Sequence, residues 1–267
     1  MRKKIIKNNS ILIRIVSVIL FFILWEINSK FSFFKFFLPD IPNTFFPSLE
    51  SIGQSIFYQF SEDNYLNAVW ISLGRVLYSF ILATIFGVIT GLISARFKML
   101  SDINYYPFEF FRQLPAVAII PFAIIIFGIG SEMKVFVSFF GCFFPIYLST
   151  IQGLQSVDTT LLKTAKKYNW EGRKLLFGIM LPAAIPYIVS ILRITLSISL
   201  ILVITSEMIV GGEGLGARLV LKERSFDFSG LYAETLVLGV IGLMLNYLFY
   251  WITSKFLFWK KELDWSK

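Results

Sequence analysis

The sequence predicts an all-α membrane protein, and three observations lead to that prediction. Hydrophobic residues make up 56% of the 267 residues, charged residues make up 16%, and the mean hydropathy is +0.72. The apolar residues gather in solid runs of about twenty, which is the length a helix needs to cross hydrocarbon. Lipid offers backbone N–H and C=O groups no partners, so only helices and closed barrels span it, and barrels show weak alternating segments instead of solid runs.

Six apolar runs are predicted to cross the membrane. In chain order they are 11–28, 68–95, 114–130, 135–153, 183–206 and 231–254. The first run follows the basic stretch MRKKIIKNNS, but no small-x-small cleavage site comes after it, so we expect a retained span and no signal peptide. With no internal repeat, low-complexity tract or soluble domain in view, residues 1–267 are expected to form one membrane domain.

The basic residues predict the orientation. If the N-terminus is cytoplasmic, about sixteen Lys and Arg lie on the inner segments and about six on the outer segments, as the positive-inside rule requires. Both termini are therefore expected in the cytoplasm. The net charge of +8 is explained as a topology signal, so no nucleic-acid partner is expected.

Two further features concern packing. The stretch 31–60 is too broken by Pro and Asp to cross, yet rich in aromatic residues, so it predicts an interfacial, partly amphipathic segment on the outer face. Paired glycines predict places where helices approach closely. These pairs are Gly87 with Gly91 in the second predicted crossing, and Gly239 with Gly242 in the sixth.

Several classes of site are excluded by composition. The chain has one cysteine, Cys142, and no histidine, so a disulfide or a zinc or iron site is not expected. No Gly-Lys dipeptide occurs, so there is no Walker A loop, and the Gly-rich stretches at 128–130 and 211–216 are predicted as turns outside the membrane. A membrane enzyme acting on lipid or a polyprenyl carrier is one alternative, which scattered acids and the lack of histidine disfavour. A structural subunit without a pore is another.

The basic segment 158–182 interrupts the apolar runs. From Leu161 to Tyr168 the apolar side chains share one helical face, and Lys163, Lys166 and Lys167 lie off it. Asn169 then interrupts, and asparagine readily adopts the left-handed conformation that ends a helix. A second helical pattern runs from Trp170 to Pro182. Two short helices joined by a turn are predicted, with an apolar face suited to headgroups or to a groove in another protein.

This segment resembles the EAA loop of ATP-binding-cassette (ABC) importer permeases. Ala165 takes the third position of the Glu-Ala-Ala element, Asn169 the glycine, and Ile179, Leu181 and Pro182 the closing Ile-x-Leu-Pro. The sequence departs from the pattern at Lys163, Thr164 and Asn169. The resemblance implies that the segment docks on the ATPase subunit. The expected contact residues are Leu161, Leu162, Ala165, Lys166, Tyr168, Asn169, Trp170, Gly172, Ile179, Leu181 and Pro182.

Other stretches resemble one branch of that superfamily, the permeases for nitrate, taurine, aliphatic sulfonates and thiamine-precursor pyrimidines. They are LWE near Trp25, SLGRVLYSF from Ser72, and the segments 111–130, 143–158 and 206–216. The resemblance implies a six-helix permease of the type I ABC importer architecture in a bacterial inner membrane. It also implies a homodimer, two cytoplasmic ATPase subunits, an extracytoplasmic solute-binding protein, and neither a cofactor nor a catalytic residue on this chain.

Three arginines lie within predicted crossings. Arg14 is close enough to the inner surface for its charge to reach the headgroups, which leaves Arg75 and Arg193. Ionisable side chains are costly in the bilayer and usually face a partner or a water-filled path. They are candidates for lining the translocation path of an anionic solute. The alternative is that each pairs with an acid or caps helix carbonyls.

Overall fold

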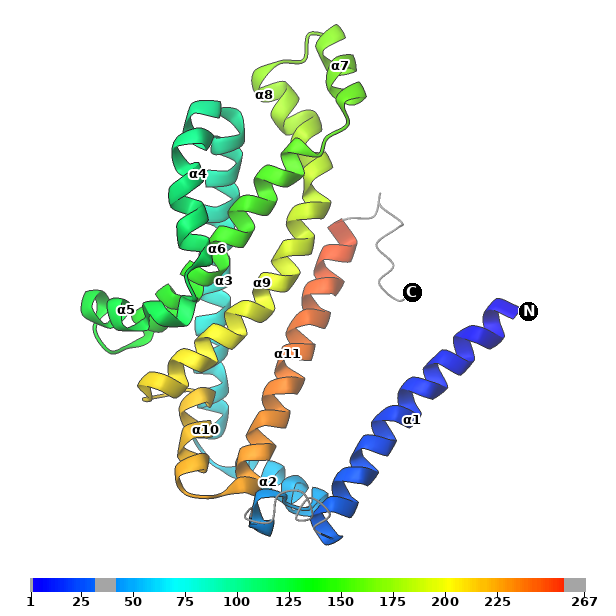
Figure 1. The fold of residues 1–267 in the computed structure, drawn as a ribbon, viewed down its shortest axis with the longest axis vertical. Helices are drawn as coiled ribbons and strands as arrows, with labels where there is room; N and C mark the ends of the chain where they lie inside the picture. The colour runs from blue at the N-terminus through cyan, green and yellow to red at the C-terminus, as the bar shows by residue number, and fades with distance from the viewer. Residues whose placement is uncertain (1, 32–41, 257–267) are drawn as a thin grey trace. The chain divides into compact units, whose positions relative to one another are not determined.

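The computed structural model describes residues 2–31 and 42–256, and every regular element in these ranges is a helix (Figure 1). Internal contacts divide the chain into two compact units. The smaller comprises residues 1–66 and 218–238, and the larger comprises 67–217 and 239–267.

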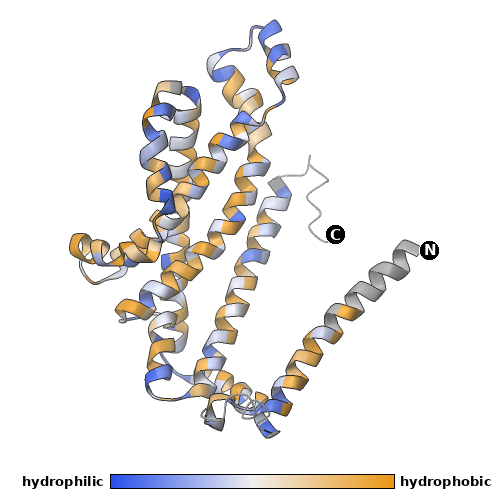
Figure 2. Cartoon of the chain, viewed as in Figure 1, coloured by the Kyte–Doolittle hydropathy of each residue, from blue (hydrophilic) through white to orange (hydrophobic). Residues whose placement is uncertain are grey.

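The larger unit is built on three long helices, α3 (Tyr65–Arg96), α6 (Ser131–Gln155) and α9 (Leu181–Val210). Apolar residues run along them and along α11 (Phe228–Phe256), as Figure 2 shows. One buried cluster joins α3 to α9 and is covered by side chains of α11, and another joins α6 to α9. The members of these clusters are Val76, Phe80, Leu196 and Val203, and Leu154, Ala184 and Ile188.

Helices α3 and α6 approach closely where the sequence predicts it. A Cβ placed on Gly87 would lie 2.8 Å from Cγ2 of Ile146, and one on Gly91 would lie 2.7 Å from Cβ of Thr150. The prediction for the first glycine pair is therefore confirmed. In the second pair the prediction is confirmed for Gly242, where a Cβ would lie 3.3 Å from Cδ2 of Leu200 on α9. It is wrong for Gly239 within the described residues, because a Cβ placed there would meet no other part of the chain within 4 Å.

Three buried serines form hydrogen bonds between α3, α6 and α9. The hydroxyl oxygens of Ser79 on α3, Ser138 on α6 and Ser199 on α9 lie 2.8 to 3.0 Å from one another, and none of the three residues is exposed. Polar groups inside a bilayer need partners within the protein, and small residues allow the helices to come close enough to supply them.

The predicted crossing at 114–130 stays a prediction, because its helical part, 116–127, is long enough to span only together with the helix before it. Helix α4 (Lys98–Gln113) ends just before this range, and a short 3-10 turn, η3 (Ala116–Ile119), leads into α5 (Ile120–Phe127). The two parts are bent by 94°. The cause is Pro115, since a residue before proline avoids the helical region, and Leu114 is extended with ψ of 128°.

Four helical stretches are long and apolar enough to cross a membrane among the described residues, or five if the bent pair is one span. The four contain the predicted crossings 68–95, 135–153, 183–206 and 231–254. The predicted crossing 11–28 lies within α1 (Arg2–Phe31). The structure does not describe the side chains of residues 11, 12, 14 and 15 in this range. The all-α membrane class is confirmed, and the total of six crossings stays a prediction.

The smaller unit contains α1, the short turn η2 (Asn43–Phe45) and α2 (Leu49–Ser61), with most of α10 (Leu215–Arg224) and the start of α11. The Ser48 hydroxyl caps α2 by accepting a hydrogen bond from the Ser51 amide at 3.2 Å. Trp25 of α1 donates to the Pro47 carbonyl at 3.0 Å. Helix α2 lies inside the stretch predicted to be interfacial, of which residues 32–41 are outside the described range.

Candidate functional site

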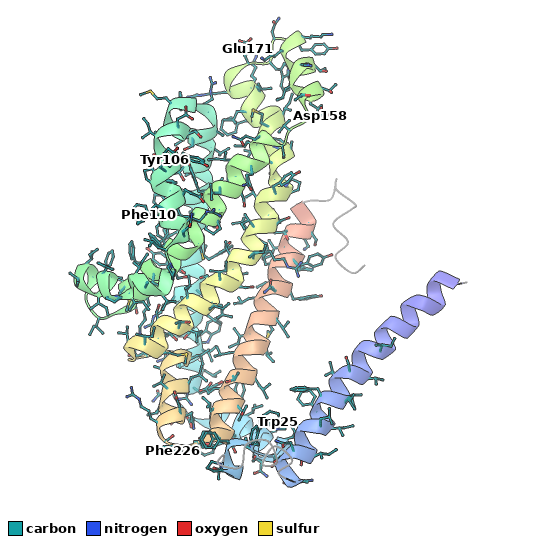
Figure 3. The ribbon with its side chains drawn as sticks, viewed as in Figure 1. Trp25, Tyr106, Phe110, Asp158, Glu171 and Phe226 are labelled. Atoms are coloured by element: carbon teal, nitrogen blue, oxygen red, sulfur yellow. The ribbon has the colours of Figure 1, made fainter. Side chains whose placement is uncertain are left out.

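The segment that joins α6 to α9 forms a helix, a turn and a second short helix. Helix α7 (Thr159–Lys167) begins at Asp158, whose carboxylate accepts a hydrogen bond from the Thr160 amide at 2.7 Å. Helix α8 (Gly172–Leu175) follows Glu171. Figure 3 labels Asp158 and Glu171 on this segment.

The turn between these helices is a Schellman motif. The Trp170 amide donates to the Ala165 carbonyl at 2.9 Å, and the Asn169 amide donates to the Lys166 carbonyl at 3.0 Å. Asn169 has φ of 56°, which is the left-handed conformation predicted from the sequence. Two of the last carbonyls of α7 are therefore satisfied within the chain, so the end of the helix is well defined.

A π turn, Leu176–Met180, connects α8 to α9, and it was not predicted from the sequence. In this turn the Leu181 amide donates to the Leu176 carbonyl five residues back, and the next residue, Pro182, has no N–H to offer the Gly178 carbonyl. Trp170 covers Gly178 so closely that a Cβ placed there would lie 2.5 Å from Cζ3 of the indole. The two parts of the segment therefore contact each other through Trp170 and Gly178, and its ends continue into α6 and α9.

The predicted apolar face of α7 has a buried part and an exposed part. Ala165 is 4% exposed and Leu162 is half-buried, so both pack inside the chain. Leu161 and Tyr168 are 52% and 75% exposed. The outer part of this face is therefore available to another molecule, and the inner part holds α7 in place.

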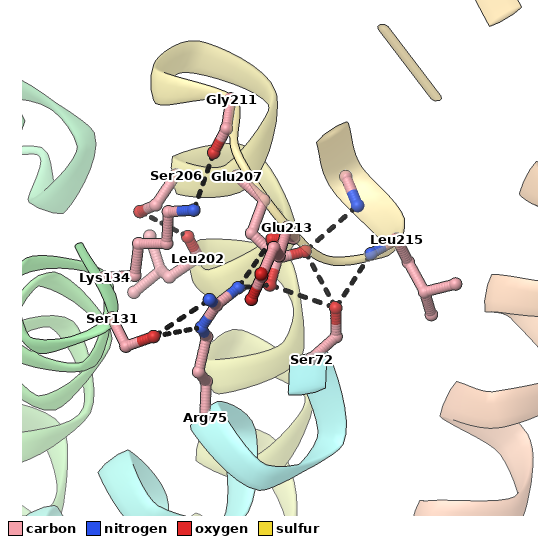
Figure 4. Close-up of polar contacts among 11 residues, drawn as sticks. Ser72, Arg75, Ser131, Lys134, Leu202, Ser206, Glu207, Gly211, Glu213 and Leu215 are labelled. Atoms are coloured by element: carbon pink, nitrogen blue, oxygen red, sulfur yellow. Dashed lines mark hydrogen bonds and ion pairs between the residues drawn. The ribbon is translucent and has the colours of Figure 1, made fainter. Parts of the chain in front are cut away.

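A second polar site lies where α3, α6 and α9 meet, and Figure 4 shows it. Arg75 of α3 and Glu207 of α9 form an ion pair of 2.6 Å whose side chains are 8% and 0% exposed. The Arg75 guanidinium also donates to the Ser131 hydroxyl at 2.9 and 3.1 Å and to the Glu213 carbonyl at 2.7 Å. Arg75 was predicted either to line the translocation path or to pair with an acid, and in the structure it is paired with an acid.

The Gly-rich loop 211–216 folds back over this ion pair. Glu207 accepts from the Ser72 hydroxyl at 2.8 Å and from the Gly216 amide at 3.0 Å, and the Lys134 ammonium donates to the Gly211 carbonyl at 2.7 Å. Gly214 has φ of 116°, and a Cβ there would overlap the Glu207 carboxylate. The predicted turn is present, and the glycines are needed so that backbone can reach a buried carboxylate.

Glu207, Ser72 and Lys134 were not among the residues predicted for this site. One signal in the sequence could have indicated this site. Ser72 and Arg75 are three positions apart, so they lie on the same face of a helix. Arg193 lies half-buried on α9, about 21 Å along the helix axis from Glu207. The structure therefore does not bring the two predicted path arginines to one site.

Comparison with known proteins identifies the family of this chain. Residues 83–257 match the model of the binding-protein-dependent transport system inner membrane component. The chain belongs to this family. The match includes the helical segment 158–182 and Glu207, and it excludes Arg75. As an ABC importer permease subunit, this multi-pass membrane chain is a transport component without enzymatic activity, and ATP hydrolysis belongs to a separate subunit.

Named relatives include two permeases for small anions. The permease is 26% identical over 252 residues to the bicarbonate transport system permease protein CmpB of Synechococcus elongatus, covering 92% of this chain and 89% of the relative. It is 28% identical over 178 residues to the nitrate import permease protein NrtB of Synechocystis, covering 67% and 65%. An inward-facing structure of the MetNI methionine ABC transporter shares the fold, with a TM-score of 0.60, 19% identity, and coverage of 70% and 93%.

Proposed function

We propose that this permease forms the translocation path for a small oxyanion. We further propose that segment 158–182 docks on the ATPase subunits and moves with them when they bind and hydrolyse ATP. The observation that carries the docking assignment is helix α7, which is capped at both ends. It holds Leu161 and Tyr168 exposed while Ala165 anchors it to the chain. Apolar side chains kept outside on a helix flanked by cations suit the groove of a partner protein.

The connection from this segment to the membrane helices supports the same proposal. Helix α6 leads directly into α7, and α8 leads through the π turn into α9. Near their junction α6 and α9 touch closely, since a Cβ on Gly153 would lie 3.0 Å from Cβ of Tyr187 and 3.2 Å from Cβ of Ala184. A displacement of α7 would therefore move α6 and α9 together, and packed helices of this kind rock between discrete arrangements.

The proposal also includes a dimer, an orientation and a delivery protein, which are supported by the family and by the distribution of Lys and Arg. Two copies of the permease form the path, both chain termini face the cytoplasm, and a soluble binding protein delivers the solute from outside. The excess of cations on the predicted inner segments supports this orientation. Membership of the family of binding-protein-dependent transport components supports the delivery step.

Leu161→Glu is expected to reduce co-purification of the ATPase subunit by about tenfold or more, because it puts a charge into an apolar contact. The measurement is the ratio of ATPase to permease after affinity purification of the permease from membranes. Lys163→Gln is the matched control, since it also lowers the net charge by one but lies on the opposite side of α7. Equal ATPase ratios for both variants and the unchanged permease would contradict docking at this face.

Two relatives support the choice of an oxyanion as the solute. Nitrate and bicarbonate are both small oxyanions, which favours nitrate or a sulfonate such as taurine over a pyrimidine as the solute. Calorimetric titration of the companion binding protein with nitrate, bicarbonate, taurine and a thiamine-precursor pyrimidine is expected to give heat only with an oxyanion or sulfonate. Tight binding of the pyrimidine alone would exclude this choice.

A further inference from the structure

Lys134 of α6 is buried in the polar site of Figure 4 without a carboxylate of its own. The residue is 3% exposed, and lysine is almost never buried to this degree unless it is paired. Among the described residues it forms no ion pair, and its ammonium donates one hydrogen bond, to the Gly211 carbonyl at 2.7 Å. An ammonium has three N–H donors, so two are left for a water molecule or a ligand.

The charges buried in this site do not balance. The Arg75 guanidinium is paired with Glu207, the buried acid of the site, so Lys134 is the excess cation. The acids nearest to it in α6 and in the Gly-rich loop are Glu132 and Glu213, which are exposed and form no ion pair in the described structure. A buried cation without a counter-charge is costly, and in membrane proteins such residues usually face a partner or a solute path.

Residues 211–213 of the Gly-rich loop, here called the strap, cover the ammonium. The Gly211 carbonyl accepts its hydrogen bond, and a Cβ placed on Gly212 would lie 3.7 Å from Nζ of Lys134. Gly212 and Glu213 are both exposed. The cover over Lys134 is therefore a thin layer of backbone, with an exposed glycine next to the charge.

Beyond Gly211 the strap is loosely held. Among the described residues the amides of Gly212 and Glu213 donate no hydrogen bond, and the Glu213 carbonyl accepts one from Arg75 at 2.7 Å. Gly212 and Gly214, on either side of Glu213, have φ of 87° and 116°, and glycine changes between such conformations at little steric cost. The strap can therefore move while α9 stays in place.

A small oxyanion would satisfy Lys134 better than the strap does. A carbonyl is a neutral acceptor, whereas a charged oxygen forms shorter hydrogen bonds with an ammonium that are about twice as strong. Lys134 also belongs to the first turn of α6, whose N-terminus has no side-chain cap. Side chains lean toward the N-terminus of their helix, so the ammonium lies near free amides and the positive end of the helix dipole.

We propose that Lys134 binds the transported oxyanion at the outer ends of α3, α6 and α9, and that the strap covers this site until the solute displaces it. This inference rests on the proposed function, which supplies the oxyanion and places the start of α6 outside the cell. The alternative role for Lys134 is structural: lysine side chains also bind the last carbonyls of a helix, as Lys134 binds Gly211 at the end of α9.

The test uses the complete permease–ATPase complex in lipid nanodiscs. Its Tm is measured in nitrate, bicarbonate and methanesulfonate, each against chloride at equal ionic strength, because a ligand of the folded state raises the Tm with its concentration. Lys134→Met is expected to raise the half-saturating concentration of the stabilising oxyanion about tenfold or more, and to lower its uptake by proteoliposomes that contain the binding protein. The Tm in chloride should stay the same or rise, because no unpaired charge remains buried.

Two further variants separate charge from structure. Lys134→Arg keeps the cation and should keep the response to the oxyanion. Lys222→Met is the matched control, since it removes another lysine from a predicted outer segment, one that is paired with Asp227 at 3.0 Å. It should leave the half-saturating concentration unchanged, and an equal loss in Lys222→Met and Lys134→Met would overturn the site.

The remaining outcomes distinguish this inference from the proposed function. If the unchanged complex takes up an oxyanion but its Tm responds to none, or if Lys134→Met responds equally well, Lys134 is not the site and the proposed function stands. If Lys134→Met lowers only the Tm in chloride, the lysine is a structural cap of α9. If the unchanged complex, supplied with its binding protein, takes up none of the three oxyanions, the proposed function and this inference are both overturned.

Discussion

Glu207→Ala is expected to destabilise the permease by about 3–5 kcal/mol, the usual effect of removing one member of a buried ion pair. The Arg75 guanidinium would stay buried without its counter-charge, and the Ser72 hydroxyl and the Gly216 amide would lose an acceptor. The measurement is the yield and Tm of the detergent-purified permease. A severe loss of folded protein is expected.

Two variants test the reason for that loss. Glu109→Ala removes a half-exposed ion pair with Arg112, so its effect should be about 0–1 kcal/mol. The double variant Arg75→Met with Glu207→Leu should recover part of the stability, because replacing both charges leaves neither member of the pair buried without its partner. If Arg75→Met alone abolishes transport while its Tm is unchanged, Arg75 acts in the translocation path and the structural account is wrong.

Gly91→Val is expected to cost about 1–3 kcal/mol or more, because its new Cβ would overlap Thr150 on α6. The Tyr147 carbonyl oxygen lies 3.0 Å from the same position, and backbone cannot move away as a flexible side chain can. Helices α3 and α6 would have to separate along the buried face they share. The Tm in detergent and the yield of permease–ATPase complex measure the effect.

Gly239→Val is the matched control for that substitution. It introduces the same side chain into another membrane helix, at a position with open space within 4 Å among the described residues. Its Tm should change little. Equal losses from Gly91→Val and Gly239→Val would show that β-branching in the helix, and not the close approach of α3 and α6, causes the effect.

Predictions from local pattern agree well with the structure. Four apolar runs lie within long helices, and Asn169 adopts the left-handed conformation at the end of α7. Both outcomes depend on neighbouring residues along the chain: hydrophobic length selects a helix, and the tolerance of a side chain for positive φ selects the turn. The break at Leu114 was also local and could have been predicted from Pro115, but the apolar run obscured it.

The polar sites were much harder to predict because their members are far apart in the sequence. Arg75 and Glu207 are separated by 132 positions, and Gln59 and Gly230 by 171. The buried pair Arg218 and Glu234 was not predicted at all. No spacing rule links such residues, since the distance between them depends on how whole helices pack.

The sequence alone determined that the protein is a helical membrane protein, where most of its long helices lie, and which segment carries a kinked pair of short helices outside the apolar runs. These properties follow from hydrophobicity and backbone preference, which act over a few turns of the chain. Only the tertiary structure decided that Arg75 is paired and buried, and that Ala165 faces inward while Leu161 faces outward. Those outcomes depend on contacts between distant elements, so no single stretch of sequence contains them.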